Sequence, residues 1–323
     1  MRYWQDRSQC VQVLAKFQRH CRHLDQYHHC FFVLVASHHS NVTIFCCRAL
    51  TEAGYDVYGS TRSSPATAPT TFTPVCGDYT NRADLDRMLR TTGAKKMFAI
   101  TDFFGAAGKS FESEVAHGRA AIDAAKSASV EHFVFCSVID AESVPNSVCH
   151  FKTKLEIEKY LKSSSLKYSI LRPCAFFENL DDAQNWNPLK KGSLKFLLSE
   201  TCTWCSTYDI GRAAAAQFKN PSKYLGQTLD VVSYQGDLSQ VAKALEIVGG
   251  VPVSHGLAVP MCVRGLFLGQ DLHQMCNYFQ ENGGVPRAQE RIATFKTAVP
   301  GAFSAEDWFR FHNRYADGTK IVQ

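Results

Sequence analysis

The sequence predicts an α/β protein with a Rossmann-type, doubly wound parallel sheet and a smaller, mostly helical C-terminal lobe on the substrate side. Short apolar runs alternate with helical segments from Phe31 to Pro173, which is typical of parallel strands joined by crossover helices. Beyond residue 174 this alternation loosens and helical patterns dominate. A chain of 323 residues with 45% hydrophobic and 20% charged residues is long enough for such a core.

The order of these patterns gives the elements one by one. A strand over 31–36 leads to a helix over 43–54, which we expect to end at Gly54. Ser304 is expected to cap the last helix. Further strands are expected over 55–62, 70–78, 95–104, 131–138, 166–173 and 228–233, and further helices over 81–93, 110–128, 155–165, 209–220, 237–250 and 303–313. Ligands of such sheets bind beyond the carboxyl ends of the strands, so we expect the site there.

Three segments follow from this division. Residues 1–30 form an N-terminal extension, 31–173 an NAD(P)-binding Rossmann-like domain, and 174–323 a smaller lobe packed on it, with 31–315 as a single unit. The extension carries cysteines and histidines, but their spacing matches no standard zinc finger, so we expect no metal site. From the sequence alone, the segment up to residue 43 can also come from an imperfect gene model or from an alternative exon.

Composition limits the function classes. The net charge of +5 is spread along the chain, which argues against direct nucleic-acid binding, and no apolar run reaches the length of about 18 residues that a membrane span needs. The thirteen cysteines are an odd number and no secretory signal is evident, which favours a reducing compartment. We expect a cytoplasmic protein, with the nucleus as an alternative.

The turn after the first strand lacks the glycines that a dinucleotide-binding loop requires. No glycine lies between Val33 and Ala53, and the expected loop reads SHHSNVT. Ser37 and Ser40 are small enough to hydrogen-bond a phosphate, and Asn41 tolerates a positive φ. Thr43 is β-branched and adds bulk where helix and strand should approach closely. The sequence therefore predicts a weakened phosphate site, or a turn that only connects two elements.

Two cationic positions point to a cofactor site. Arg62, at the end of the second strand, stands where a cation can meet the 2′-phosphate of NADP, although a surface arginine at a strand end explains it as well. His150 and Lys154 lie one helical turn apart. Short-chain dehydrogenases have a tyrosine and a lysine at this spacing, and the tyrosine donates the proton. Histidine replaces the tyrosine here, so the same chemistry need not follow.

Motifs in a fixed order give the chain a family resemblance. VLV is followed by RALTEAGYDV, and then come STR, VCGD, AITDFF, HFKTK, LRPCAFFENL, YDIGRAAA and SAEDWF. The chain resembles the NmrA-like family of atypical short-chain dehydrogenases, which includes fungal nitrogen-metabolite regulators and animal NADPH-sensor proteins. The resemblance implies bound NADP(H), with the nicotinamide near the loop after the fourth strand.

The resemblance also implies roles for single residues. Arg62 resembles the 2′-phosphate contact, and Lys154 resembles the lysine that contacts the ribose. Thr101 and Phe103 would line the cofactor cleft. The family's glycine loop falls on Ser37, Ser40 and Thr43, which all depart from it. The segment flanking the nicotinamide would contain Pro173, Phe176 and Asn179.

Three hypotheses follow. The leading one is an NADP(H)-sensing or regulatory protein with little or no dehydrogenase activity, which acts through a protein partner such as a transcription factor or a signalling enzyme. The second is an NADP-dependent reductase of the isoflavone-reductase type, in which Lys154, with or without His150, manages the proton. The third is a structural pseudoenzyme without nucleotide. A homodimer stays open in each case.

Overall fold

A computed structural model describes residues 30–34, 41–61, 72–181, 189–190 and 193–312. Side chains are described throughout these ranges except in 30–34, 41–42 and 189–190. Ser37, Ser40 and Arg62 therefore lie outside the described residues, as does nearly all of the N-terminal extension. Within the described segments, no helix combines the length and apolar character that crossing a membrane requires.

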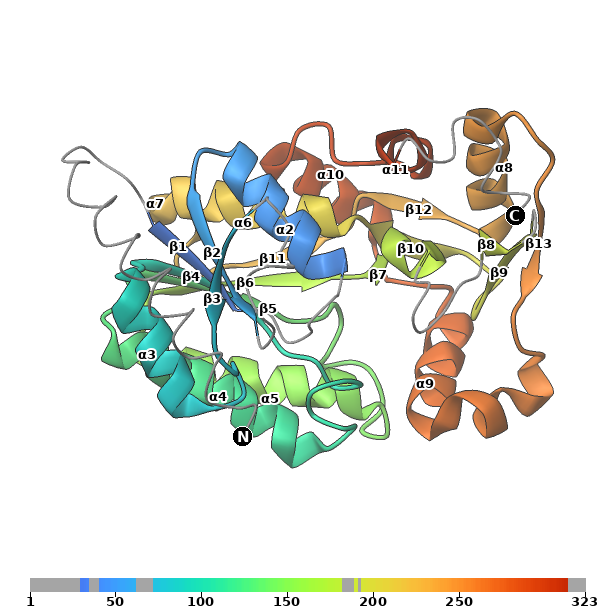
Figure 1. Cartoon of the computed structure of the whole chain (residues 1–323). Coiled ribbons are helices and arrows are strands. Elements are labelled where there is room, and N and C mark those ends of the chain that lie inside the picture. The colour runs from blue at the N-terminus through green and yellow to red at the C-terminus, as the bar shows by residue number, and fades with distance from the viewer. Residues whose placement is uncertain (1–29, 35–40, 62–71, 182–188, 191–192, 313–323) are drawn as a thin grey trace, which may run out of the picture.

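The central layer is a seven-stranded parallel sheet, as the sequence predicts (Figure 1). The strand order is β11-β6-β5-β4-β1-β2-β3, so the chain reverses its direction of winding between β1 and β4. In doubly wound sheets this switch point is where dinucleotides bind. The strands are β1 (Cys30–Leu34), β2 (Asp56–Thr61), β3 (Thr73–Cys76), β4 (Lys96–Ile100), β5 (His132–Cys136), β6 (Tyr168–Pro173) and β11 (Thr228–Val231).

Helices cover both faces of this sheet (Figure 1). One face packs on α3 (Arg82–Thr92), α4 (Phe111–Ser127) and α5 (Cys149–Ser163). The other packs on α2 (Asn41–Glu52), α6 (Thr207–Lys219) and α10 (Ala288–Ala298), with the short α7 (Pro221–Tyr224) after α6. β11, α6 and α10 all follow residue 173. The second half of the chain therefore contributes one strand to the central sheet and two of the helices that cover it.

The remaining elements form the C-terminal lobe around its own apolar core. Phe177 stacks on Trp204 and on Trp308, with ring centroids 5.6 and 5.7 Å apart. Two three-stranded sheets lie here, β12-β10-β7 and β13-β9-β8. The lobe contains β7 (Ala175–Phe176), η3 (Phe177–Asp181), β8 (Leu189–Lys190), β9 (Ser193–Phe196), β10 (Cys202–Cys205), β12 (Tyr234–Gly236), α8 (Leu238–Gly249), β13 (Ser254–Leu257), η4 (Met261–Val263), α9 (Arg264–Glu281) and α11 (Ala305–Phe311).

Local signals in the sequence fix several helix ends. Ser304 caps α11 with its side chain, as expected, and forms a capping box with Asp307. Asn81 caps α3 in the same way, at the start of the helix expected from residue 81. The strand expected over 95–104 is wrong at its end, because β4 stops at Ile100. Asp102 accepts a hydrogen bond from the Gly105 N–H (2.9 Å) and closes a turn instead.

Candidate functional site

The candidate site lies at the carboxyl edge of the sheet, where the loop after β4 and the start of α5 lie on one face and α2 begins on the other. Asn41 is the first residue of α2, the helix that follows β1. Because α2 follows β1, the amino terminus of α2 lies at the switch point of the sheet. The free backbone N–H groups at a helix amino terminus favour an anion. Thr43 is buried in the first turn of α2. The described residues thus include the strand and the helix that flank the expected phosphate loop, while the loop itself lies outside them.

Lys154 is held by an ion pair inside the protein. Its Nζ lies 2.7 Å from Glu114 Oε1 and donates to Thr101 O and Thr101 Oγ1, both at 2.5 Å. The Glu114 residue is completely buried, and only 10% of the Lys154 side chain is exposed. Glu114 also accepts hydrogen bonds from Thr101 Oγ1 (2.7 Å) and from Thr153. The ammonium that the family resemblance assigns to a ribose is therefore occupied by protein groups.

Electrostatics explain why this ion pair persists. Burial alone would raise the pKa of Glu114, but the charge and hydrogen bond of Lys154, together with the hydroxyls of Thr153 and Thr101, outweigh it. The pKa of Glu114 is lowered as a result. Glu114 therefore stays ionised at neutral pH and keeps Lys154 in place.

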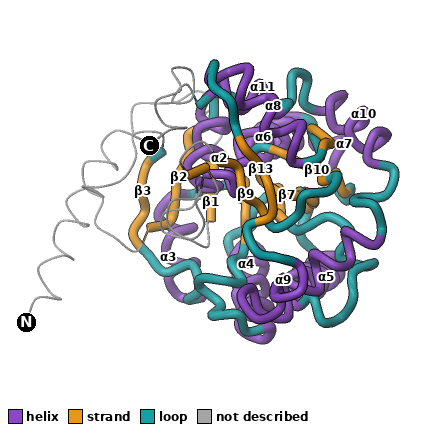
Figure 2. The backbone as a smooth tube through the Cα atoms, turned by 90° about the vertical axis from the view of Figure 1, so that its right-hand side faces the viewer, coloured by secondary structure: helices purple, strands orange, loops and turns teal. Residues whose placement is uncertain are grey.

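His150 has an acid partner from the other half of the chain. Its Nδ1 forms a hydrogen bond with Asp271 Oδ1, and its backbone N–H donates to Asp271 Oδ2 at 3.2 Å. Asp271 belongs to α9, which lies beside α5 (Figure 2). The side chain of Val148, the N-cap residue of α5, accepts no hydrogen bond, so Asp271 supplies the missing acceptor from outside the helix.

Aromatic rings surround His150. The centroids of Phe103, Phe104 and Phe151 lie 6.0, 5.1 and 4.8 Å from that of His150. Phe103 is buried, whereas Phe104 is 43% exposed. The loop after β4 thus presents a ring to solvent beside a histidine that is paired with an acid.

The structure brings together part of the set predicted from sequence. Thr101 contacts Lys154, and Phe103 contacts His150. Thr153 joins the two pairs into one group, because its hydroxyl contacts both Glu114 and the His150 carbonyl oxygen (3.1 Å). Pro173 ends β6, and Phe176 and Asn179 follow it in β7 and η3, at the same edge of the sheet. They make no contact with that group in the hydrogen bonds and ring pairs of the described residues.

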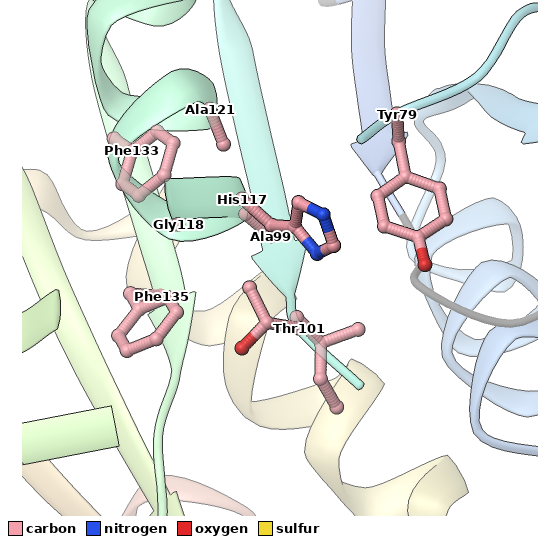
Figure 3. A pocket seen from close by; sticks show the side chains of 9 residues that line it. Tyr79, Ala99, Thr101, His117, Gly118, Ala121, Phe133 and Phe135 are labelled. Atoms are coloured by element: carbon pink, nitrogen blue, oxygen red, sulfur yellow. The ribbon is translucent and has the colours of Figure 1, made fainter. Parts of the chain in front are cut away.

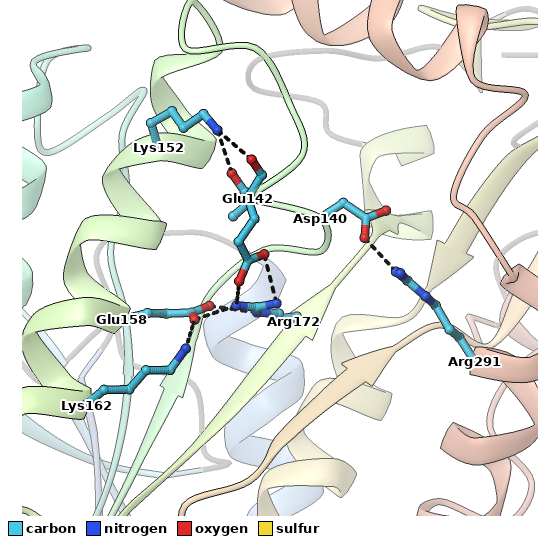
Figure 4. Close-up of polar contacts among 8 residues, drawn as sticks. Asp140, Glu142, Lys152, Glu158, Lys162, Arg172 and Arg291 are labelled. Atoms are coloured by element: carbon cyan, nitrogen blue, oxygen red, sulfur yellow. Dashed lines mark hydrogen bonds and ion pairs between the residues drawn. The ribbon is translucent and has the colours of Figure 1, made fainter.

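A salt-bridge network fixes the other flank of this edge (Figure 4). Arg172 on β6 donates to Glu158 on α5 (2.8 and 2.6 Å) and to Glu142 in the loop after β5 (2.6 and 3.1 Å). Lys152 donates to the carbonyls of Ala141 and Glu142, and so binds the same loop to α5. Strand, helix and loop are thereby locked beside the site.

The cavity enclosed by β4, β5 and α4 is too small to be the binding site. It has room for about 10 Å³, roughly one water molecule. Figure 3 shows His117, from α4, beside Thr101 and facing Tyr79, with Phe133 and Phe135 on the far wall. This cavity therefore cannot hold a nucleotide. A larger, open hollow of about 270 Å³ lies between β11 and α10, lined by residues such as Asp230 and Arg291.

Sequence reasoning missed both acids of the site. Glu114 stands in the first turn of α4, where an acid is common at a helix start. Asp271 lies 121 residues from His150 in a segment that has no predicted element. Only the fold brings these carboxylates to α5. The described residues hold no cluster of side chains that fits a metal ion.

Comparison of the sequence with models of protein families shows to which family the chain belongs. The model of the NmrA-like family matches residues 42–299. The chain belongs to the NmrA-like family. Solved structures with the same fold include NmrA, a negative transcriptional regulator, in complex with NADP (18% identity, TM-score 0.66, 88% of this chain and 95% of NmrA). Triphenylmethane reductase of Citrobacter sp. also matches (14% identity, TM-score 0.68, 87% and 98% coverage). These identities establish the likeness of fold alone.

Prestalk A differentiation protein A of Dictyostelium discoideum is a relative that matches over a shorter stretch. It is 32% identical over 111 residues, which are 34% of this NmrA-like chain and 34% of the relative. The alignment thus spans about a third of the relative's length.

Proposed function

We propose that this NmrA-like chain is an NADP(H)-binding regulatory protein with little or no activity of the tyrosine–lysine dehydrogenase type. The observation that carries the proposal is the closed ion pair of Lys154 and Glu114. A lysine that lowers the pKa of a catalytic tyrosine needs a free ammonium and a tyrosine one turn earlier. This chain has His150 at that position and has engaged Lys154 elsewhere.

The frame of a dinucleotide site supports the cofactor part of the proposal. The amino terminus of α2 follows β1 at the switch point, and Thr101 and Phe103 follow β4. NmrA, which shares the fold, was solved in complex with NADP. In this chain Ser37, Ser40 and the α2 amides would hold the pyrophosphate, and Arg62 the 2′-phosphate. We expect weak binding, since side chains replace the glycines that let phosphate approach the backbone.

A regulatory role requires a second participant. We propose that the chain acts through a protein partner, such as a transcription factor or a signalling enzyme, whose binding responds to the NADPH to NADP⁺ ratio. NmrA, described as a negative transcriptional regulator, supports this class of role. We place the protein in the cytoplasm, with the nucleus as a second compartment.

Calorimetric titration of the purified chain with NADPH, NADP⁺ and NADH tests the proposal. We expect NADPH or NADP⁺ to bind at least ten times more tightly than NADH, and the Arg62→Ala variant to lose that preference. At a hundred times the dissociation constant, the ligand should stabilise the fold by about 2.7 kcal/mol. Failure of all three nucleotides to bind would contradict the proposal and favour the nucleotide-free pseudoenzyme.

A further inference from the structure

Alternate residues of β11, an edge strand of the central sheet, have backbone groups without a partner in the described part of the chain. The Ile170 N–H donates to the Gln227 carbonyl oxygen at 3.0 Å, so Gln227 and every second residue after it face β6. Successive residues of a strand turn their N–H and C=O groups to opposite sides, and those of Thr228 and Asp230 therefore point away from β6. Unpaired groups at a sheet edge can bind another strand.

The opposite edge of the sheet has a proline at an outward position. β3 forms that edge, and the Gly77 N–H donates to the Thr61 carbonyl oxygen of β2 at 2.9 Å. Gly77 and every second residue before it face β2, so Pro74 points outward. Proline has no N–H to offer, and it is one of the residues by which proteins protect sheet edges. β11 contains no proline, so its edge lacks this protection.

The free edge of β11 borders the open hollow of about 270 Å³ between β11 and α10. Thr228, Leu229 and Asp230 line the hollow from the strand, and residues of α10 line it from the other side together with Arg287, which precedes this helix. The outward backbone groups of Thr228 and Asp230 therefore lie beside space that another chain can enter. Peptides that add as a strand to an exposed sheet edge use free backbone groups for affinity and neighbouring side-chain pockets for selectivity.

The charges around Arg291, which lines the hollow, are unbalanced. Two carboxylates share this arginine, because its Nη1 lies 2.8 Å from Asp140 Oδ1 (Figure 4) and its Nε lies 3.5 Å from Asp230 Oδ2. The Asp140 side chain is only 9% exposed, and its Oδ2 has no hydrogen-bond partner among the described residues. Burial raises the pKa of Asp230 more than the nearby arginines lower it. Because Arg287 and Glu290 at the rim neutralise each other, the hollow has a place for one further cation.

We propose that the free edge of β11 and the adjoining hollow are the docking site for a protein partner, which adds a short extended segment to β11 as a further strand and places a lysine or arginine of that segment beside Asp230 and Asp140. The inference rests on the proposed function in needing a protein partner, and it adds where that partner binds and which charge it carries. β6 and β5 separate this edge from β4 and the switch point, so docking can be measured without nucleotide.

A synthetic pentapeptide tests the charge selectivity on the unchanged protein. The probe is TVKVT with fluorescein on its amino end and an amidated carboxyl end, and fluorescence anisotropy in the absence of nucleotide measures its affinity. We expect saturable binding with a Kd below about 1 mM. The matched peptide TVEVT should bind at least about tenfold more weakly, because the carboxylates of the hollow repel its glutamate. No saturable binding of TVKVT, or equal affinity for both peptides, would overturn the inference.

N-methylated forms of the same peptide separate strand pairing from contact through side chains. One form has a methyl group on the backbone nitrogen of the lysine, and the other has methyl groups on the nitrogens of both valines. These nitrogens lie on opposite edges of an extended peptide, and only one edge can pair with β11. We therefore expect the affinities of the two forms to differ by at least about tenfold. Equal affinities would show that the peptide does not add to the sheet and would overturn the inference.

Two protein variants assign the binding to this edge. Asp230→Asn should lose most of the preference for TVKVT over TVEVT, whereas Glu246→Gln, on α8 and outside the hollow, should keep it. Thr228→Pro removes the outward N–H at the first residue of β11, a position where an edge strand tolerates proline, and should weaken TVKVT binding at least about tenfold. A melting curve of each variant confirms that it is folded. Unchanged binding to a folded Thr228→Pro, or the full preference in Asp230→Asn, would overturn the inference.

Sedimentation velocity distinguishes a different partner protein from a second copy of this chain. We expect Thr228→Pro to leave the oligomeric state of the protein unchanged. A dimer of the parent that Thr228→Pro dissolves would assign the edge of β11 to a second copy and overturn the inference. Failure of TVKVT to bind overturns this inference alone, because the NADPH titration does not involve β11. Failure of the nucleotides to bind overturns the cofactor part of the proposed function and leaves the peptide result standing.

Discussion

Replacing Lys154 by methionine should show how strongly the buried ion pair holds the site. Methionine keeps most of the volume of the side chain but leaves the Glu114 carboxylate, completely buried, without a cation. Removing one partner of a buried pair costs about 3–5 kcal/mol, because the other charge stays desolvated. Glu114 keeps its hydroxyl donors Thr101 and Thr153, which favours the lower end of that range. We therefore expect a loss of about 3 kcal/mol at pH 7.5.

The loss should depend on pH in a direction that follows from the pKa of Glu114. In the parent protein this pKa is lowered, so the ion pair contributes its stability above the unfolded pKa and loses it as the pH falls through the folded pKa. Without Lys154, burial becomes the main influence and raises the pKa of Glu114. The variant then loses stability as the pH rises above the unfolded value. The gap between the two proteins should thus widen from pH 5 to pH 7.5.

Urea unfolding at the two pH values measures this gap. The double variant Lys154→Met/Glu114→Gln is the control, since it removes the stranded charge and should recover at least half of the loss at pH 7.5. A single variant that loses less than about 1 kcal/mol at pH 7.5 would show that the pair is not desolvated. The same loss at both pH values would refute the assignment of Glu114 as the group that titrates.

Two further predictions compare matched pairs. Glu158→Gln should destabilise the fold by about 3 kcal/mol in urea unfolding, because Glu158 is completely buried against Arg172. Glu142→Gln removes a half-exposed partner of the same arginine and should cost less than about 1 kcal/mol. Gly211→Ala should lower stability by about 1–3 kcal/mol, since its Cβ would lie 2.7 Å from backbone atoms of α2. Gly256→Ala meets only a lysine tip at 3.7 Å and should change stability by less than about 0.5 kcal/mol, and a comparable loss in both variants would contradict the packing argument.

The sequence predicts the parallel sheet because its signals are local. Apolar runs, caps such as Asn81 and breakers such as Pro173 act within a few residues, so the central strands and the helices α3, α4, α6 and α8 are found within a few positions of their places. The sequence pattern predicts neither α9 nor α10, and both helices are missed. The short strands of the second lobe, such as Ala175–Phe176, carry no periodicity because two to four residues are too few to show one. They exist through pairing with distant segments, which no local pattern encodes.

In the candidate site, too, local features are predictable from the sequence and contacts between distant segments are not. Sequence spacing places His150 and Lys154 on one face of α5, and the structure confirms that they start the same helix. Their acid partners come from α4 and α9, and only tertiary packing selects them. The predicted cofactor roles of Arg62, Thr101, Phe103, Pro173, Phe176 and Asn179 stay predictions.

The ion pair of Lys154 and Glu114 also determines what a tyrosine at position 150 would achieve. In a His150→Tyr variant the phenol would stand one turn from Lys154, at the dehydrogenase spacing. Lys154 would still be bonded to Glu114 and Thr101, so its ammonium would lower the tyrosine pKa little. We expect His150→Tyr to oxidise NADPH no faster than the parent protein when an aromatic aldehyde is offered as substrate. A His150→Tyr variant at least tenfold faster would mean that Lys154 leaves Glu114 when a tyrosine is present, so that the ion pair does not prevent this chemistry.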